Sequence, residues 1–176
     1  LHWDLLQKFD LPGDDECPDL YPLTADDGRT LWVYSGAHDM YFVGDFDENG
    51  LYQPIQSVGQ LSYNSQSYAA QTYYYEPGKP VIRFAWNRSD IPGAPFNGSM
   101  CTPTEMTLKK HGDRYYLSAL PIKSTENLVV KSDKLDDFTL THCTHELGSK
   151  TCRISFTVKE GDLTCNLYGL EMKLDK

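Results

Sequence analysis

Met40-Tyr41-Phe42-Val43-Gly44-Asp45-Phe46-Asp47-Glu48-Asn49-Gly50 is the stretch that decides the fold class of this chain. Residues 40–46 are rich in aromatic and β-branched side chains, which favour strands. The Asn49-Gly50 pair that follows is typical of a hairpin turn. The stretch also matches the first half of an EF-hand calcium loop, but Gln56 stands where that loop needs a glutamate. We therefore predict a strand and a turn here, with no metal.

The strand-and-turn pattern repeats along the chain, and no stretch has convincing helical periodicity. Strands are predicted at residues 31–34, 68–75, 81–86, 105–108 and 115–120. Beyond Lys134 the composition changes, and the alternation predicts sandwich-like strands with one wet face at residues 139–147, 152–158, 163–167 and 170–174. We place a boundary near residues 122–135. The sequence thus predicts an all-β protein, while periodicity leaves a sandwich, a barrel and propeller blades open.

Composition excludes several classes of partner. The 176 residues carry a net charge of -9, which argues against nucleic acid or an anionic membrane surface, since both need a basic patch. No apolar run approaches the length that spans a membrane. The twelve Tyr, seven Phe and three Trp suit sheets and sugar-facing surfaces. We expect no nucleic acid and no membrane as partners.

The five cysteines form neither a CxxC pair nor an even set; they are Cys17, Cys101, Cys143, Cys152 and Cys165. Cys152 and Cys165 lie in phase with apolar neighbours, which predicts free thiols on the apolar faces of strands. A disulfide among the last three cysteines is the alternative. A zinc site at residues 142–145 is disfavoured, because His142 and Cys143 would point to opposite faces of a strand.

Two triplets, residues 87–89 and 97–99, fit the glycosylation sequon. These triplets favour an extracellular or secreted protein.

Acidic residues gather near the start of the chain, around Glu16-Cys17-Pro18-Asp19-Leu20. Residue chemistry alone favours a solvated loop for Asp14, Asp15, Glu16 and Asp19. The segments that follow Glu16 change this interpretation; they are residues 21–23, 32–33, 41–47, 67–72, 84–86 and 101–108. In this order, residues 12–125 resemble glycoside hydrolase family 32, which contains the invertases, inulinases and levanases.

The resemblance implies a fold, an activity and a site. The family fold is a five-bladed β-propeller followed by a β-sandwich, so residues 1–125 would supply the last blades and residues 126–176 the start of a sandwich or a reduced one. The family hydrolyses β-fructofuranosides such as sucrose, inulin or levan by a retaining mechanism and without a cofactor. Glu16 would be the general acid/base, with Cys17, Tyr68 and Trp86 binding the substrate. Tyr68 and Trp86 can equally be core aromatics at strand ends.

The sequence also departs from the family pattern. Thr104 stands where arginine is usual, and Ser62 and Asn64 replace a common aspartate and glycine. The Asn-Asp-Pro motif with the nucleophile and the Arg-Asp-Pro motif with the transition-state stabiliser do not occur. In the family both precede the Glu-Cys pair. We therefore expect this chain alone to be inactive and to have a companion N-terminal fragment or to form an oligomer. Thr104 and the altered run before Tyr68 favour, as the alternative, a non-catalytic carbohydrate-binding propeller. An interaction module with an accidental resemblance is a third possibility.

Overall fold

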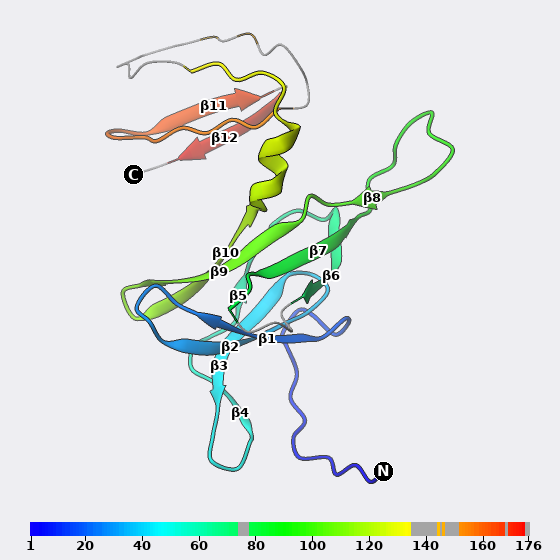
Figure 1. Cartoon of the computed structure of the whole chain (residues 1–176), viewed down its shortest axis with the longest axis vertical. Helices are drawn as coiled ribbons and strands as arrows, with labels where there is room; N and C mark the ends of the chain where they lie inside the picture. Colours follow the sequence, from blue (N-terminus) through cyan, green and yellow to red (C-terminus); the bar gives the residue numbers. More distant parts are fainter. Residues whose placement is uncertain (74–77, 135–143, 145, 147–151, 168, 175–176) are drawn as a thin grey trace. The chain divides into compact units, whose positions relative to one another are not determined.

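The computed structural model describes residues 1–73, 78–134, 144, 146, 152–167 and 169–174. The chain divides into two compact units, Leu1–Ser132 and Asp133–Lys176. Each unit contains antiparallel strands (Figure 1), and the predicted all-β class is confirmed. Among the described residues, no helix is long and apolar enough to cross a membrane.

The first sheet of unit 1 has the strand order β1-β2-β3-β4, and β5 also pairs with β3. Its strands are β1 (Asp19–Thr24), β2 (Thr30–Ser35), β3 (Met40–Phe46), β4 (Tyr52–Pro54) and β5 (Gly59–Gln60). The strand predicted at residues 40–46 is confirmed. Side chains of β3 alternate between buried and partly buried up to Val43, as expected when one sheet face packs on a core.

The turn between β3 and β4 is organised by the carboxylate of Asp47. Its Oδ1 accepts hydrogen bonds from the backbone N–H groups of Asn49 at 2.9 Å and Leu51 at 3.0 Å. Its Oδ2 accepts one from the amide of Gln53 at 3.0 Å. These hydrogen bonds hold the pKa of Asp47 below its usual value, and the bond from the Leu51 backbone has the largest effect. The predicted hairpin turn is therefore confirmed.

The second sheet of unit 1 has the order β10-β9-β7-β6, and β8 pairs with β7. Its strands are β6 (Ser67–Tyr73), β7 (Val81–Asn87), β8 (Ser99–Met100), β9 (Thr104–His111) and β10 (Arg114–Pro121). A 3₁₀ helix, η1 (Lys123–Leu128), follows β10. Strand β6 is interrupted between Tyr68 and Gln71, where its register against β7 shifts. Such a bulge re-aims side chains locally.

One hydrophobic core joins the two sheets. Leu31, Val33 and Val43 from the first sheet are completely buried in the same cluster as Met106 and Leu108 from the second. The sheets also meet directly, because Ala25 forms a parallel bridge with Leu108. Because the two sheets share this core, the loops at their ends are fixed relative to one another.

Unit 2 contains one described hairpin, β11 (Leu163–Leu167) with β12 (Leu170–Leu174). Both strands agree with the prediction, and Leu163, Cys165 and Leu167 share the less exposed face of β11.

The strand predicted at residues 152–158 is wrong. These residues form no strand, and Cys152 is an exposed free thiol. An alternating sequence becomes a strand only where a neighbour accepts its hydrogen bonds, and β11 pairs with β12 instead. Cys17, Cys101 and Cys165 are also free and are half-buried. The strand predicted at residues 139–147 and the zinc alternative at residues 142–145 fall largely outside the described residues, as does Cys143 in the disulfide alternative.

Candidate active site

Glu16 lies in the loop before β1, and its backbone is tied to the turn between β2 and β3. The N–H of Ala37 donates to the Glu16 carbonyl at 2.9 Å. The next residue, Cys17, has a φ of 47°, a conformation that costs a non-glycine residue energy and persists only when its surroundings impose it. The Cys17 carbonyl accepts a hydrogen bond from the Gln71 amide at 3.0 Å. The side chain of Glu16 itself is exposed.

Tyr68 brings the second sheet to this carboxylate. Its hydroxyl donates a hydrogen bond to Oε2 of Glu16. This bond is the first cause that raises the pKa of Tyr68, because ionising the phenol would remove the donated proton beside a negative charge. The bulge after Tyr68 contains Ala69 at a φ of 51°, and the Ala69 N–H donates to the Ala37 carbonyl at 3.0 Å. Ala37 therefore anchors both segments.

Aromatic and cationic side chains surround the Tyr68 ring. Trp86 lies opposite Tyr68 in the register of β6 and β7, with ring centroids 6.2 Å apart. The Arg88 guanidinium lies 4.1 Å from the Tyr68 ring centroid, a cation–π contact. Trp86 keeps 46% of its surface exposed. A Cβ added at Gly98 would lie 2.5 Å from the indole Nε1, so the absence of a side chain there leaves room for the Trp86 ring.

His38 reaches the same cluster from the turn between β2 and β3. Its ring packs edge-to-face on Tyr68, with centroids 4.8 Å apart. Its backbone N–H donates to Oδ2 of Asp14 at 2.6 Å, and its Nδ1 lies 3.1 Å from Oδ1 of the same carboxylate. The Asp14 carboxylate occupies space beside Gly36, where an added Cβ would lie 2.4 Å from Asp14 Cγ. Gly36 thus makes room for the pair.

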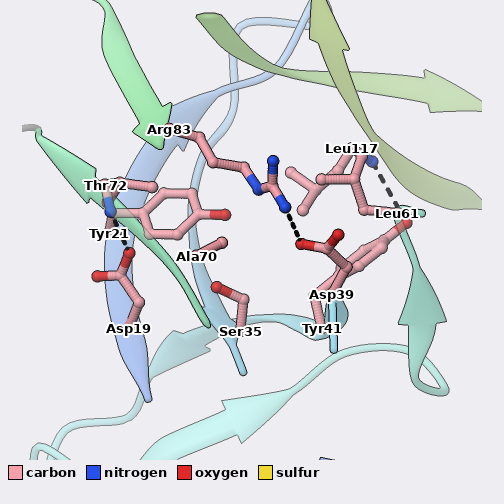
Figure 2. A pocket seen from close by; sticks show the side chains of 10 residues that line it. All are labelled: Asp19, Tyr21, Ser35, Asp39, Tyr41, Leu61, Ala70, Thr72, Arg83 and Leu117. Atoms are coloured by element: carbon pink, nitrogen blue, oxygen red, sulfur yellow. Dashed lines mark hydrogen bonds and ion pairs between the residues drawn. The ribbon is translucent and has the colours of Figure 1, made fainter. Parts of the chain in front are cut away.

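Asp39, the residue after His38, forms a buried ion pair with Arg83 (Figure 2). Nη2 of Arg83 on β7 lies 2.5 Å from Oδ1 of Asp39 and donates to Ser67 Oγ at 3.0 Å. Burial is the main cause that raises the pKa of Asp39, and Arg83 opposes it. Asp39 has a φ of 65°. Both charged side chains border a cavity of about 10 Å³, which is also lined by Tyr21 and Thr72. The Oγ1 atom of Thr72 is buried and has no hydrogen-bond partner among the described residues.

The structure places Tyr68 in contact with both Glu16 and Trp86, while the roles expected for these residues stay predictions. The contact that the structure shows for Cys17 near this set is the hydrogen bond that its carbonyl accepts from the Gln71 amide. The expectation of a solvated acidic loop is wrong for Asp14, whose side chain is completely buried, because it has two hydrogen-bonding partners on one residue.

Sequence reasoning missed the supporting side chains around this set. They are His38, Asp14, Arg88, Asp39 and Arg83. Their contacts join residues that are far apart in the sequence, such as Asp14 with His38 and Asp39 with Arg83, so no local pattern marks these roles. Within the described residues, no cluster of three or more potential ligands could hold a metal ion.

The candidate site of this all-β protein is thus an exposed carboxylate that lies between two sheets, beside aromatic side chains. The model of the glycosyl hydrolases family 32 N-terminal domain matches residues 1–119. The chain therefore belongs to this family. Its assignment to the last blades of a five-bladed propeller, followed by part of a sandwich, stays a prediction.

The chain is also similar to individual proteins. The levanbiose-producing levanase of Bacillus subtilis is 27% identical over 179 residues, which is 90% of this chain and 33% of the levanase. The fructan beta-fructosidase of Streptococcus mutans is 29% identical over 139 residues, or 64% of this chain and 10% of that protein. The exo-inulinase of Aspergillus awamori has a similar fold, with a TM-score of 0.54 and 24% identity over 66% of this chain and 28% of the inulinase. The chain thus spans a minor part of these relatives.

Proposed function

We propose that this chain supplies the general acid/base of a retaining glycoside hydrolase that acts on β-fructofuranosides such as sucrose, inulin or levan. The observation that carries the proposal is the hydrogen bond from Tyr68 to Glu16 beside the exposed face of Trp86. Family membership and the names of the levanase and fructosidase relatives support the substrate class.

Glu16 would protonate the glycosidic oxygen as the bond breaks and later accept a proton from water. An acid/base must reach the substrate, and the side chain of Glu16 is exposed while its backbone is anchored at Ala37. Tyr68 holds one carboxylate oxygen, which orients the carboxyl group for this exchange. Trp86 offers an apolar ring for the carbon face of a sugar.

A carbohydrate-binding protein without chemistry is the second candidate, and one observation favours it. The retaining mechanism needs a second carboxylate about 5 Å from the first. Of the acidic residues that the structure describes as buried, Asp14 contacts His38 and Asp39 contacts Arg83. Both carboxylates are engaged by these partners, and Thr104 stands where the family usually has arginine.

The proposal is tested by comparing turnover of sucrose, inulin and levan by the full-length gene product and by its Glu16→Gln variant. The variant should lose activity by orders of magnitude on these substrates, which have poor leaving groups. Its melting temperature should stay the same, because the change is nearly isosteric at an exposed position. Glu48→Gln, in the exposed turn after β3, is the matched control. Normal turnover by Glu16→Gln would remove Glu16 from the mechanism. Sugar binding without turnover by the unmodified protein would favour the binding candidate.

A further inference from the structure

Asp14 and His38 form a pair whose two members differ sharply in exposure. The Asp14 side chain is 0% exposed, whereas the His38 side chain is 48% exposed. A buried carboxylate needs hydrogen-bond donors, and His38 provides both its backbone N–H and Nδ1. Asp14 therefore binds the imidazole at one nitrogen, while about half of the His38 side chain stays exposed.

This arrangement determines which nitrogen of His38 can meet a ligand. The N–H at Nδ1 donates to the Asp14 carboxylate, so Nε2 is the free ring nitrogen. A carboxylate that orients an imidazole in this way is a recurring device for presenting the other nitrogen to a bound group. Nε2 can accept a hydrogen bond when the ring is neutral and donate one when it is charged.

The position of the ring is well defined by its neighbours. His38 contacts Tyr68, the residue that donates to Glu16. The next residue, Asp39, is held by the buried pair with Arg83. A side chain whose backbone and one ring nitrogen are both anchored loses little further conformational freedom on binding, which favours affinity.

We propose that His38 is a sugar-binding residue, whose Nε2 contacts a hydroxyl of the fructoside held against Glu16. Asp14 is its positioning residue. The inference rests on the proposed function, because it takes Glu16, Tyr68 and Trp86 as the carbohydrate site. The charges near the ring are Glu16, Arg88, Asp14 and the Asp39–Arg83 pair, which contains both signs. A neutral, hydroxyl-rich ligand suits this mixture better than an ion.

Nuclear magnetic resonance of the ¹⁵N-labelled 176-residue chain, titrated with sucrose and with an inulin-type trisaccharide, tests this assignment without requiring turnover. Long-range ¹H–¹⁵N spectra distinguish the two ring nitrogens. The fructosides should shift Nε2 of His38 more than Nδ1, along with the resonances of Tyr68 and Trp86. Maltose, which contains no fructose, is the control ligand.

Variants test the same contact by affinity. Loss of one hydrogen bond predicts that His38→Ala weakens fructoside binding by the folded variant about five- to tenfold. The melting temperature should also fall, because the buried Asp14 carboxylate loses its Nδ1 donor. His111→Ala, at an exposed histidine at the end of β9, should bind as the unmodified chain does. Asp14→Asn should weaken binding and reduce the fructoside-induced shift at Nε2 of His38 while Tyr68 and Trp86 still shift, a readout that a merely structural role would not move.

The outcomes separate this inference from the proposed function. If fructosides shift Tyr68 and Trp86 but not His38, and His38→Ala binds normally, the Asp14–His38 pair only anchors the loop and the inference is wrong. The proposed site would then stand. If fructosides shift none of these residues, both proposals fail for this chain.

Discussion

Asp39 and Arg83 connect the two sheets of unit 1 through a buried ion pair, with 2.5 Å between Oδ1 and Nη2. Asp39 directly precedes β3 in the first sheet, and Arg83 lies within β7 in the second. The pair fixes the turn that carries His38 relative to the strands that carry Tyr68 and Trp86. The site is therefore coupled to the packing of the sheets.

Arg83→Met should destabilise the protein by about 3–5 kcal/mol at neutral pH, because it leaves the Asp39 carboxylate buried without its partner. The loss should shrink as the pH falls through the pKa of Asp39, which burial raises, since a protonated Asp39 no longer needs a cation. Denaturant unfolding at several pH values measures both effects. Lys110→Met, which breaks the exposed pair of Lys110 with Asp27, should change the free energy of unfolding little. An equal effect of the two variants would contradict the structural role of the buried pair.

The bond between Tyr68 and Glu16 predicts a linked titration. The pKa of Tyr68 is raised, first by its hydrogen bond to Glu16. Glu16→Gln removes the negative charge that disfavours the phenolate, so Tyr68 should ionise at a lower pH in the variant. The ¹³Cζ resonance of Tyr68, assigned with Tyr68→Phe, follows this ionisation. An identical titration in both proteins would mean that the two side chains do not meet in solution.

The hairpin between β3 and β4 should weaken in acid through Asp47. Its pKa is lowered from 3.8 by backbone hydrogen bonds, chiefly with Leu51. A lowered pKa in the folded state gives stability that is fully present above 3.8 and is lost as the pH falls through the folded pKa. The difference in unfolding free energy between the unmodified chain and Asp47→Ala should therefore narrow below pH 3.8. A difference that does not depend on pH would exclude the carboxylate as its source.

We also expect the chain to associate with a companion fragment or with a second copy, since unit 1 exposes large apolar side chains. Tyr73 and Trp86 are exposed, whereas Trp32 and Phe84 are half-buried. Exposed apolar surface promotes binding to a companion fragment or to a second copy. Light scattering at serial dilutions, with limited proteolysis, measures this. A protease-resistant monomer at every concentration would contradict the expectation.

Local patterns in the sequence were sufficient for β2, β3, β6, β7, β9 and β10 of unit 1, but they missed β1, β4, β5 and β8. The alternation and turn residues from Met40 to Gly50 correspond to β3 and its hairpin because side-chain alternation and backbone turns depend on neighbouring residues. The Glu16-Cys17 segment, read with those that follow, was also sufficient for the family. The same local method failed at residues 152–158, where a strand required a partner.

The supporting side chains of the site depended on tertiary structure. Asp14 and His38 are 24 residues apart, Asp39 and Arg83 are 44 apart, and Glu16 and Tyr68 are 52 apart. No spacing along the chain predicts such contacts, because they form only when the core brings the two sheets together. The sequence supplies the carboxylate and its family, whereas packing determines which side chains hold it and which face the ligand.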